Sequence, residues 1–198
     1  MRLYDEQWFD RLRTAVSIAD GPPLSLDALV DVSWLGLDEL AFGYRLGYVS
    51  PALAVDVSLQ WYRAGLAQND VQEQLALTLR SDLDWADEAL LLHSPGLGVQ
   101  RSECLWLYVT MALFQARWTS NAAADISLEF AEVIAYWTSS AATLWLDIEE
   151  PRRFGILRRQ PSVREMNERL DNVLRRQRAI YLTPSGGEQV TPSAPRSE

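Results

Sequence analysis

Apolar residues return every three or four positions along most of this chain, far more often than at every second position. That spacing places them on one face of an α-helix, whereas runs of β-branched residues bounded by hairpin turns are scarce. The sequence therefore predicts an all-α protein. We expect helices over Leu3–Ile18, Leu26–Val32, Asp38–Leu46, Pro51–Ala64, Val71–Leu79, Trp85–Leu92, Ser102–Trp118, Ile126–Trp137 and Val163–Leu182.

Length and composition set the number of domains. The chain has 198 residues, of which 48% are hydrophobic, and this is enough for one core but too little for two large ones. We therefore expect a single compact multi-helix domain. Residues 139–157 give no clear pattern. Residues 183–198 are rich in Pro, Ser and Gly with almost nothing apolar to bury, so a disordered C-terminal tail is predicted there.

Several helix ends have a local cause. Ser50 precedes Pro51, which pairs a capping hydroxyl with a residue whose missing N–H costs nothing at the first helical position. Gly47 can adopt the left-handed conformation that ends a helix, after which Tyr48 is expected to fold back onto Phe42. These signals predict a helix–turn–helix corner. Another helix start is predicted by the capping box from Ser162 to Glu165.

Charge is unevenly spread along the chain. Residues 1–150 carry 8 arginines and 22 acids, a net charge of −14, whereas residues 151–198 carry 10 arginines and 5 acids, a net charge of +5. There is no lysine. We therefore divide the chain into an acidic helical body at 1–150, an Arg-rich helix at 151–182 that packs on the same domain, and the tail at 183–198.

Composition excludes several classes of protein. The overall charge of −9 argues against binding to nucleic acid or anionic lipid by bulk charge. One cysteine and one histidine exclude disulfides and multi-cysteine or two-histidine metal sites within one chain. No charge-free stretch exceeds 14 residues, too few to cross a bilayer, and the first residues lack a signal-peptide pattern. We expect a cytoplasmic protein without a cofactor.

The segment from Asp38 to Pro51 holds two glycines, Gly43 and Gly47, in or beside an expected helix. Inside a helix Gly43 costs about 1 kcal/mol relative to alanine, so it is expected to permit a close helix crossing. Packing and capping explain this segment more simply than a binding site does. The motif consists of Glu39, Phe42, Gly43, Tyr44, Gly47, Tyr48, Val49 and Ser50.

In this order of residues the segment resembles an uncharacterised family of small bacterial proteins associated with toxin–immunity loci. The resemblance covers about Leu24 to Leu66, a quarter of the chain, and includes no catalytic residue. It implies an immunity or interaction role. The basic region from Arg152 to Arg178 departs from this otherwise acidic type.

Four acids gather where the Trp85–Leu92 helix is expected to begin: Asp82, Asp84, Asp87 and Glu88. The simplest explanation is the helix dipole, which favours negative charge at this end. The functional alternative is an acidic face that binds a basic partner, such as a toxin domain, with charge steering the encounter. Oxygen ligation of Mg²⁺ or Ca²⁺ is a third option, although the spacing does not match a Ca²⁺ loop.

Nine arginines lie between residues 152 and 178, among them Arg164, Arg169, Arg175 and Arg176. The expected helix there carries a narrow apolar seam. Docking on the acidic body, with arginines pairing its carboxylates, is the simplest explanation. The second explanation is that the apolar seam binds a second copy of the chain or another partner. A nucleic-acid contact is the third, because the body with its net charge of −14 would repel a duplex. The seam residues are Val163, Met166, Leu170, Val173, Gln177 and Ile180.

No catalytic constellation can be assembled from the sequence. His93 is expected to end a helix, and Cys104 lies in an apolar helix as a small hydrophobe. The eight tryptophans fit either an aromatic core or an aromatic groove. We therefore expect a non-enzymatic protein that neutralises a toxin. The alternative is a nucleic-acid or assembly factor that acts through the Arg-rich helix.

Overall fold

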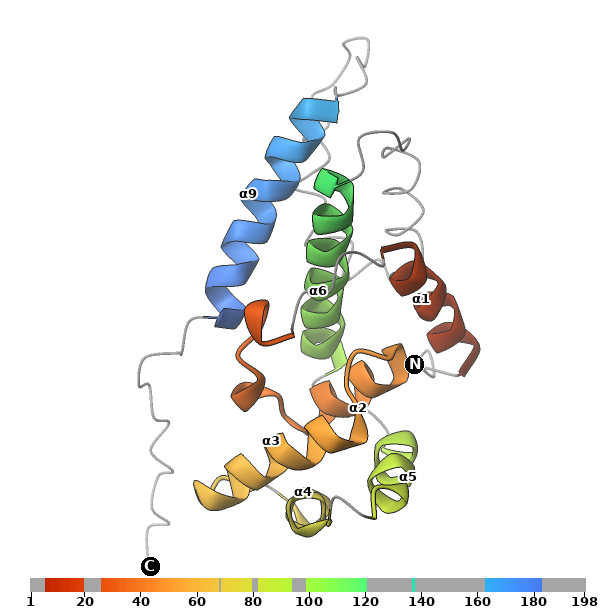
Figure 1. The fold of residues 1–198 in the computed structure, drawn as a ribbon, viewed down its shortest axis with the longest axis vertical. Coiled ribbons are helices and arrows are strands. Elements are labelled where there is room, and N and C mark those ends of the chain that lie inside the picture. Colours follow the sequence, from red (N-terminus) through yellow and green to blue (C-terminus); the bar gives the residue numbers. More distant parts are fainter. Residues whose placement is uncertain are drawn as a thin grey trace, which may run out of the picture.

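The computed structural model describes residues 6–19, 26–67, 69–79, 82–93, 99–120, 137 and 163–182. Every regular element within these residues is a helix. This confirms the all-α fold class (Figure 1). The elements are α1 (Glu6–Ala19), the 3₁₀ turns η1 (Leu26–Ala28) and η2 (Val32–Trp34), α2 (Leu37–Leu46), α3 (Pro51–Arg63), α4 (Asp70–Leu77), α5 (Asp84–Leu92), α6 (Val99–Ser120) and α9 (Val163–Leu182).

Helix α6 is the central element. It packs against α1, α2 and α9, and Figure 1 shows it between α1 and α9 with α2 at its lower end. Its side chains from Leu105 to Met111 are all buried, so this stretch is covered on every side, as expected of a helix with neighbours all round. Trp106 and Tyr108 are the largest of its fully buried side chains.

The predicted corner between α2 and α3 is confirmed. Gly47 ends α2 with φ at 85°, in the left-handed region, and the Ser50 hydroxyl oxygen accepts a hydrogen bond from the Leu53 N–H at 3.2 Å. Pro51 occupies the first position of α3, as predicted. The ring of Tyr48, however, stacks on Trp106 of α6 at 5.4 Å, a partner from outside the segment that local reasoning did not suggest.

The predicted helix over Leu26–Val32 is wrong: the stretch holds only the 3₁₀ turn η1 at Leu26–Ala28, and the second turn, η2, begins at its last residue, Val32. Asp31 lies between the two turns and caps the second. Its carboxylate accepts a hydrogen bond from the Ser33 N–H at 3.1 Å, where η2 begins. Its own N–H donates to the Tyr181 carbonyl of α9 at 2.9 Å. Aspartate competes with helix hydrogen bonds in this way, which is why it favours caps over helix interiors.

Helix α9 docks on α6 through Leu170, Val173 and Leu174, all of them buried. Further along, the ring of Tyr181 lies 5.3 Å from that of Tyr108. The expectation that Ile180 belongs to this seam is wrong, since its side chain is 63% exposed. A helix of 3.6 residues per turn brings the eleventh residue after Leu170 back to the same face, and that residue is Tyr181.

Several expectations lie outside the described residues. They are the Ile126–Trp137 helix (except Trp137, which is buried), the Ser162 half of the capping box and the tail at 183–198. Within the described residues, none of the helices combines the length and apolar character needed to span a bilayer.

Candidate interaction surfaces

Gly43 of α2 faces Trp106 of α6. An added Cβ at Gly43 would lie only 2.6 Å from Cε2 of Trp106, so only glycine fits where the two helices meet. The indole N–H of Trp106 donates to the Glu39 carbonyl at 2.9 Å. The expected close helix crossing at Gly43 is therefore confirmed, and Trp106 is the side chain that requires it.

Aromatic packing fixes the other side of α2. Phe42 is fully buried, and its ring lies edge-on to Trp8 at 5.6 Å and to Phe9 at 5.2 Å. Such edge-to-face pairs stabilise beyond the area they bury. Trp8, Trp106 and Trp137 are buried in the core, and Trp61 and Trp85 are partly buried and pack against it.

Glu39 is a buried acid at the start of α2. Its side chain is 9% exposed, and one carboxylate oxygen lies 3.3 Å from Nε of Arg101, whose own side chain is largely exposed. Burial raises the pKa of the Glu39 carboxyl, while Arg101 and the backbone N–H groups of Gly36 and Glu39 act in the opposite direction. The folded protein therefore disfavours the ionised form of the Glu39 carboxyl relative to water.

This shift predicts a pH-dependent stability. Because the native pKa is raised above the usual value of 4.5, the native state holds a proton that the unfolded state has lost, so stability falls as pH rises from 4.5. Glu39→Gln removes this contribution to the pH dependence of the unfolding free energy. The difference in unfolding free energy, variant minus wild type, should rise between pH 4.5 and 7.5 in urea titrations. Glu88→Gln, at an exposed site, is the control for losing one charge, and a difference that falls with pH would contradict the assignment.

The acidic cluster is only partly free for binding. Asp82, Asp84 and Glu88 are exposed, whereas the Asp87 carboxylate accepts a hydrogen bond from the Tyr44 hydroxyl of α2. Burial and this bond to Asp87 raise the pKa of Tyr44 to about 12. Asp84 and Asp87 lie in the first turn of α5, where the helix dipole favours them. The structure thus joins one residue of the glycine motif to one of the cluster.

A polar clamp, formed by Asp38, Tyr44 and Arg45 of α2, holds α5 in place. Besides the Tyr44 bond, Arg45 donates to the carbonyls of Leu91 and His93, the second at 3.1 Å. Nε2 of His93 lies 2.6 Å from the Asp38 carboxylate. His93 ends α5 as predicted, but its acidic partner was missed because Asp38 lies 55 residues away and no local pattern links them.

Exposed leucines accompany the acids of α5. Leu91 and Leu92 are 46% and 72% exposed, and they follow Asp84 and Glu88 at helical spacing on the outer side of α5. Leu77, the last residue of α4, and Leu79, two positions after it, are 63% and 70% exposed. We group these exposed residues of α4, α5 and the connection between them under one name, the acidic–leucine surface: Leu77, Leu79, Asp82, Asp84, Glu88, Leu91 and Leu92.

Two arginines of α9 pair with acids on their own helix. Arg164 pairs with Glu168 at 2.9 Å, and Arg175 pairs with Asp171. We had expected the arginines to pair with carboxylates of the acidic body. These two instead pair with acids one turn away on α9, which are nearer. Arg169 is partly buried and Arg176 is exposed. Both pairs lower the positive charge that α9 presents to solvent.

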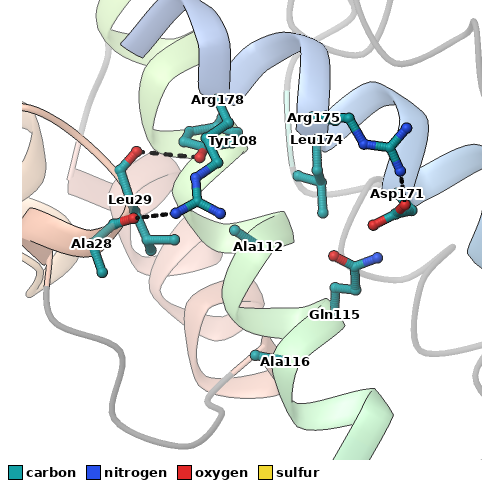
Figure 2. Close-up of a pocket in the computed structure, with 10 residues that line it drawn as sticks. All are labelled: Ala28, Leu29, Tyr108, Ala112, Gln115, Ala116, Asp171, Leu174, Arg175 and Arg178. Carbon is teal, nitrogen blue, oxygen red and sulfur yellow. Dashed lines mark hydrogen bonds and ion pairs between the residues drawn. The ribbon is translucent and has the colours of Figure 1, made fainter. Parts of the chain in front are cut away.

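A groove of about 430 Å³ lies between α6, α9 and η1. Figure 2 shows Ala112 of α6 and Leu174 of α9 at its centre, with Arg178 and Tyr108 at one end. The Tyr108 hydroxyl donates to the Leu29 carbonyl at 3.2 Å. The sequence did not reveal this groove, because it forms between segments about 80 and 150 residues apart. Its volume lies in the range typical of small-molecule sites.

The described residues include neither a metal-binding cluster nor a thiol with a lowered pKa. Among the described residues, no three His, Cys, Asp or Glu side chains are placed to share a metal ion. Burial and the neighbouring Glu103 raise the pKa of Cys104 to about 11, so its thiol is protonated at neutral pH. Compared with protein-family models, curated proteins and solved structures, the chain gives no match.

Proposed function

We propose that this chain is a non-enzymatic, cytoplasmic interaction protein that binds a basic protein partner, and that the partner is a bacterial toxin domain it neutralises. The observation that supports this function best is the acidic–leucine surface. It combines three exposed carboxylates with four exposed leucines. Exposed apolar groups beside charges are typical of protein interfaces, in which apolar contacts bind and charges steer the encounter.

The polar clamp supports the same proposal. Binding is stronger when the binding surface is already ordered, because less conformational entropy is lost on association. Tyr44, Arg45 and Asp38 fix α5 at both its ends, so Asp84, Glu88 and Leu92 are presented on a rigid helix. The resemblance of the α2 segment to families at toxin–immunity loci points to the same class of partner.

The alternative, a nucleic-acid or assembly role for α9, has weaker support. Two of its arginines are already paired with Glu168 and Asp171. The chain as a whole is acidic, with a net charge of −9. Such a molecule repels a duplex that comes within about a Debye length, roughly 8 Å at physiological salt.

Charge reversal tests the proposal. Tagged wild type should capture one basic protein in stoichiometric amount from the native cell, and the triple variant Asp82→Arg, Asp84→Arg, Glu88→Arg should weaken that binding by about 100-fold or more, since like charges would then face each other. Asp87 is left intact because it holds Tyr44. Asp27→Arg, at an exposed acid of η1, is the matched control and should bind as wild type does.

Quantifying protein and nucleic acid after low-salt and high-salt washes separates the alternatives. Equal capture by the wild type and the triple variant would refute the acidic–leucine surface as the binding site. Nucleic acid that is released by salt would favour the role of α9 instead.

A further inference from the structure

The groove between α6, α9 and η1 has a polar end and an apolar centre. At the polar end lie the Arg178 guanidinium and the Tyr108 hydroxyl; at the centre, Ala112 faces Leu174 (Figure 2). Gln115 and the Arg175–Asp171 pair close the other end. An elongated ligand with one anionic head and an apolar body matches this order of groups.

Arg178 is the cation available to such a head. Its Nη2 donates to the Ala28 carbonyl at 3.4 Å, which is long for an N–H···O hydrogen bond, and that carbonyl is neutral. Arg175, in contrast, donates to the carboxylate of Asp171 and to the side-chain oxygen of Asn172. A guanidinium binds a carboxylate through two parallel hydrogen bonds, a geometry that a single carbonyl cannot supply.

Small side chains create the space. Ala112 and Ala116 lie one turn apart on α6 and, with Ala28, line the groove where larger residues would fill it. Both alanines of α6 are only partly buried, so a ligand can reach them. Burial of an apolar chain against Ala112 and Leu174 removes its surface from water, which is the main source of affinity for such ligands.

We propose that this groove binds a small amphiphile with a single carboxylate, its carboxylate on Arg178 and its apolar chain between Ala112 and Leu174. The site is separate from the acidic–leucine surface. Its existence does not depend on the proposed function.

Octanoate is the probe, with 1-octanol as its uncharged counterpart. In a ¹H–¹⁵N NMR titration, octanoate should shift the amide signals of Ala112, Leu174 and Arg178 in a saturable way, with a Kd on the order of 1 mM. Octanol should bind about tenfold more weakly because it leaves Arg178 without a carboxylate.

Three variants test the assignment. Arg178→Gln should weaken octanoate binding about tenfold, whereas Arg176→Gln, which removes an exposed charge of α9 outside the groove, should leave it unchanged. Ala112→Leu should abolish binding by filling the groove, and an unchanged amide spectrum elsewhere shows that the variant is folded. The absence of saturable shifts, or equal binding of octanoate by the wild type and Arg178→Gln, would overturn the proposal.

Discussion

Replacing Gly43 by alanine is expected to lower the free energy of unfolding by about 2 kcal/mol, although alanine is the better helix former by about 1 kcal/mol. The cause is the indole of Trp106, whose Cε2 would lie 2.6 Å from the new Cβ. Trp106 is fully buried, stacks on Tyr48 and donates to the Glu39 carbonyl, so it cannot move aside.

A double-mutant cycle shows whether Trp106 is responsible. Trp106→Phe removes the outer ring atoms that obstruct a side chain at position 43, so Gly43→Ala should cost at least about 1 kcal/mol less in that background. Urea denaturation monitored by circular dichroism measures all four proteins. If Gly43 served a ligand and not the crossing, Gly43→Ala alone would raise stability by about 1 kcal/mol, as helix propensity dictates.

The contrast between local and distant causes explains what the sequence could predict. Ser50, Pro51 and Gly47 act on backbone groups within four residues, and their roles at the α2–α3 corner were predicted correctly. Asp31 also acts locally, but its hydrogen bond to Ser33 competes with helix formation, and a pattern of apolar residues does not reveal that competition. The expected Leu26–Val32 helix failed for this reason.

Tertiary partners were beyond sequence reasoning. A glycine inside a helix predicts a close crossing, yet the residue that needs the space, Trp106, lies 63 positions further along the chain. The bond between Tyr44 and Asp87 likewise joins two residues that had been singled out for separate reasons. Periodicity reports which face of an element is apolar, but the fold decides which faces meet.

The candidate surfaces follow the same division. Exposure of Asp82, Asp84 and Glu88 could be expected from their charge, whereas the clamp that orients α5 depends on contacts 43 to 55 residues apart in sequence. The groove beside Arg178 depends on a contact across 150 residues. Because such contacts form only when the chain has folded, the composition of α9 alone predicted a charged helix and no cavity.

The register of α9 can be tested by one buried and one exposed position. Leu170→Asp should lower the free energy of unfolding by about 3 kcal/mol or more, because it places a carboxylate in the seam between α6 and α9, where Leu170 is 1% exposed. Ile180→Asp adds the same charge to the same helix at a position 63% exposed, and should change stability by no more than about 0.5 kcal/mol.

Urea denaturation compares the two variants, and limited proteolysis of α9 reports whether it has left the body. Since α9 carries Leu174 and Arg178, its release in Leu170→Asp should also abolish octanoate binding, whereas Ile180→Asp should retain it. Equal stability of both variants would mean that the apolar seam does not dock on α6 and is free for a dimer or another partner. A larger loss in Ile180→Asp would instead place Ile180 in the seam and exclude the register in which Tyr181 meets Tyr108.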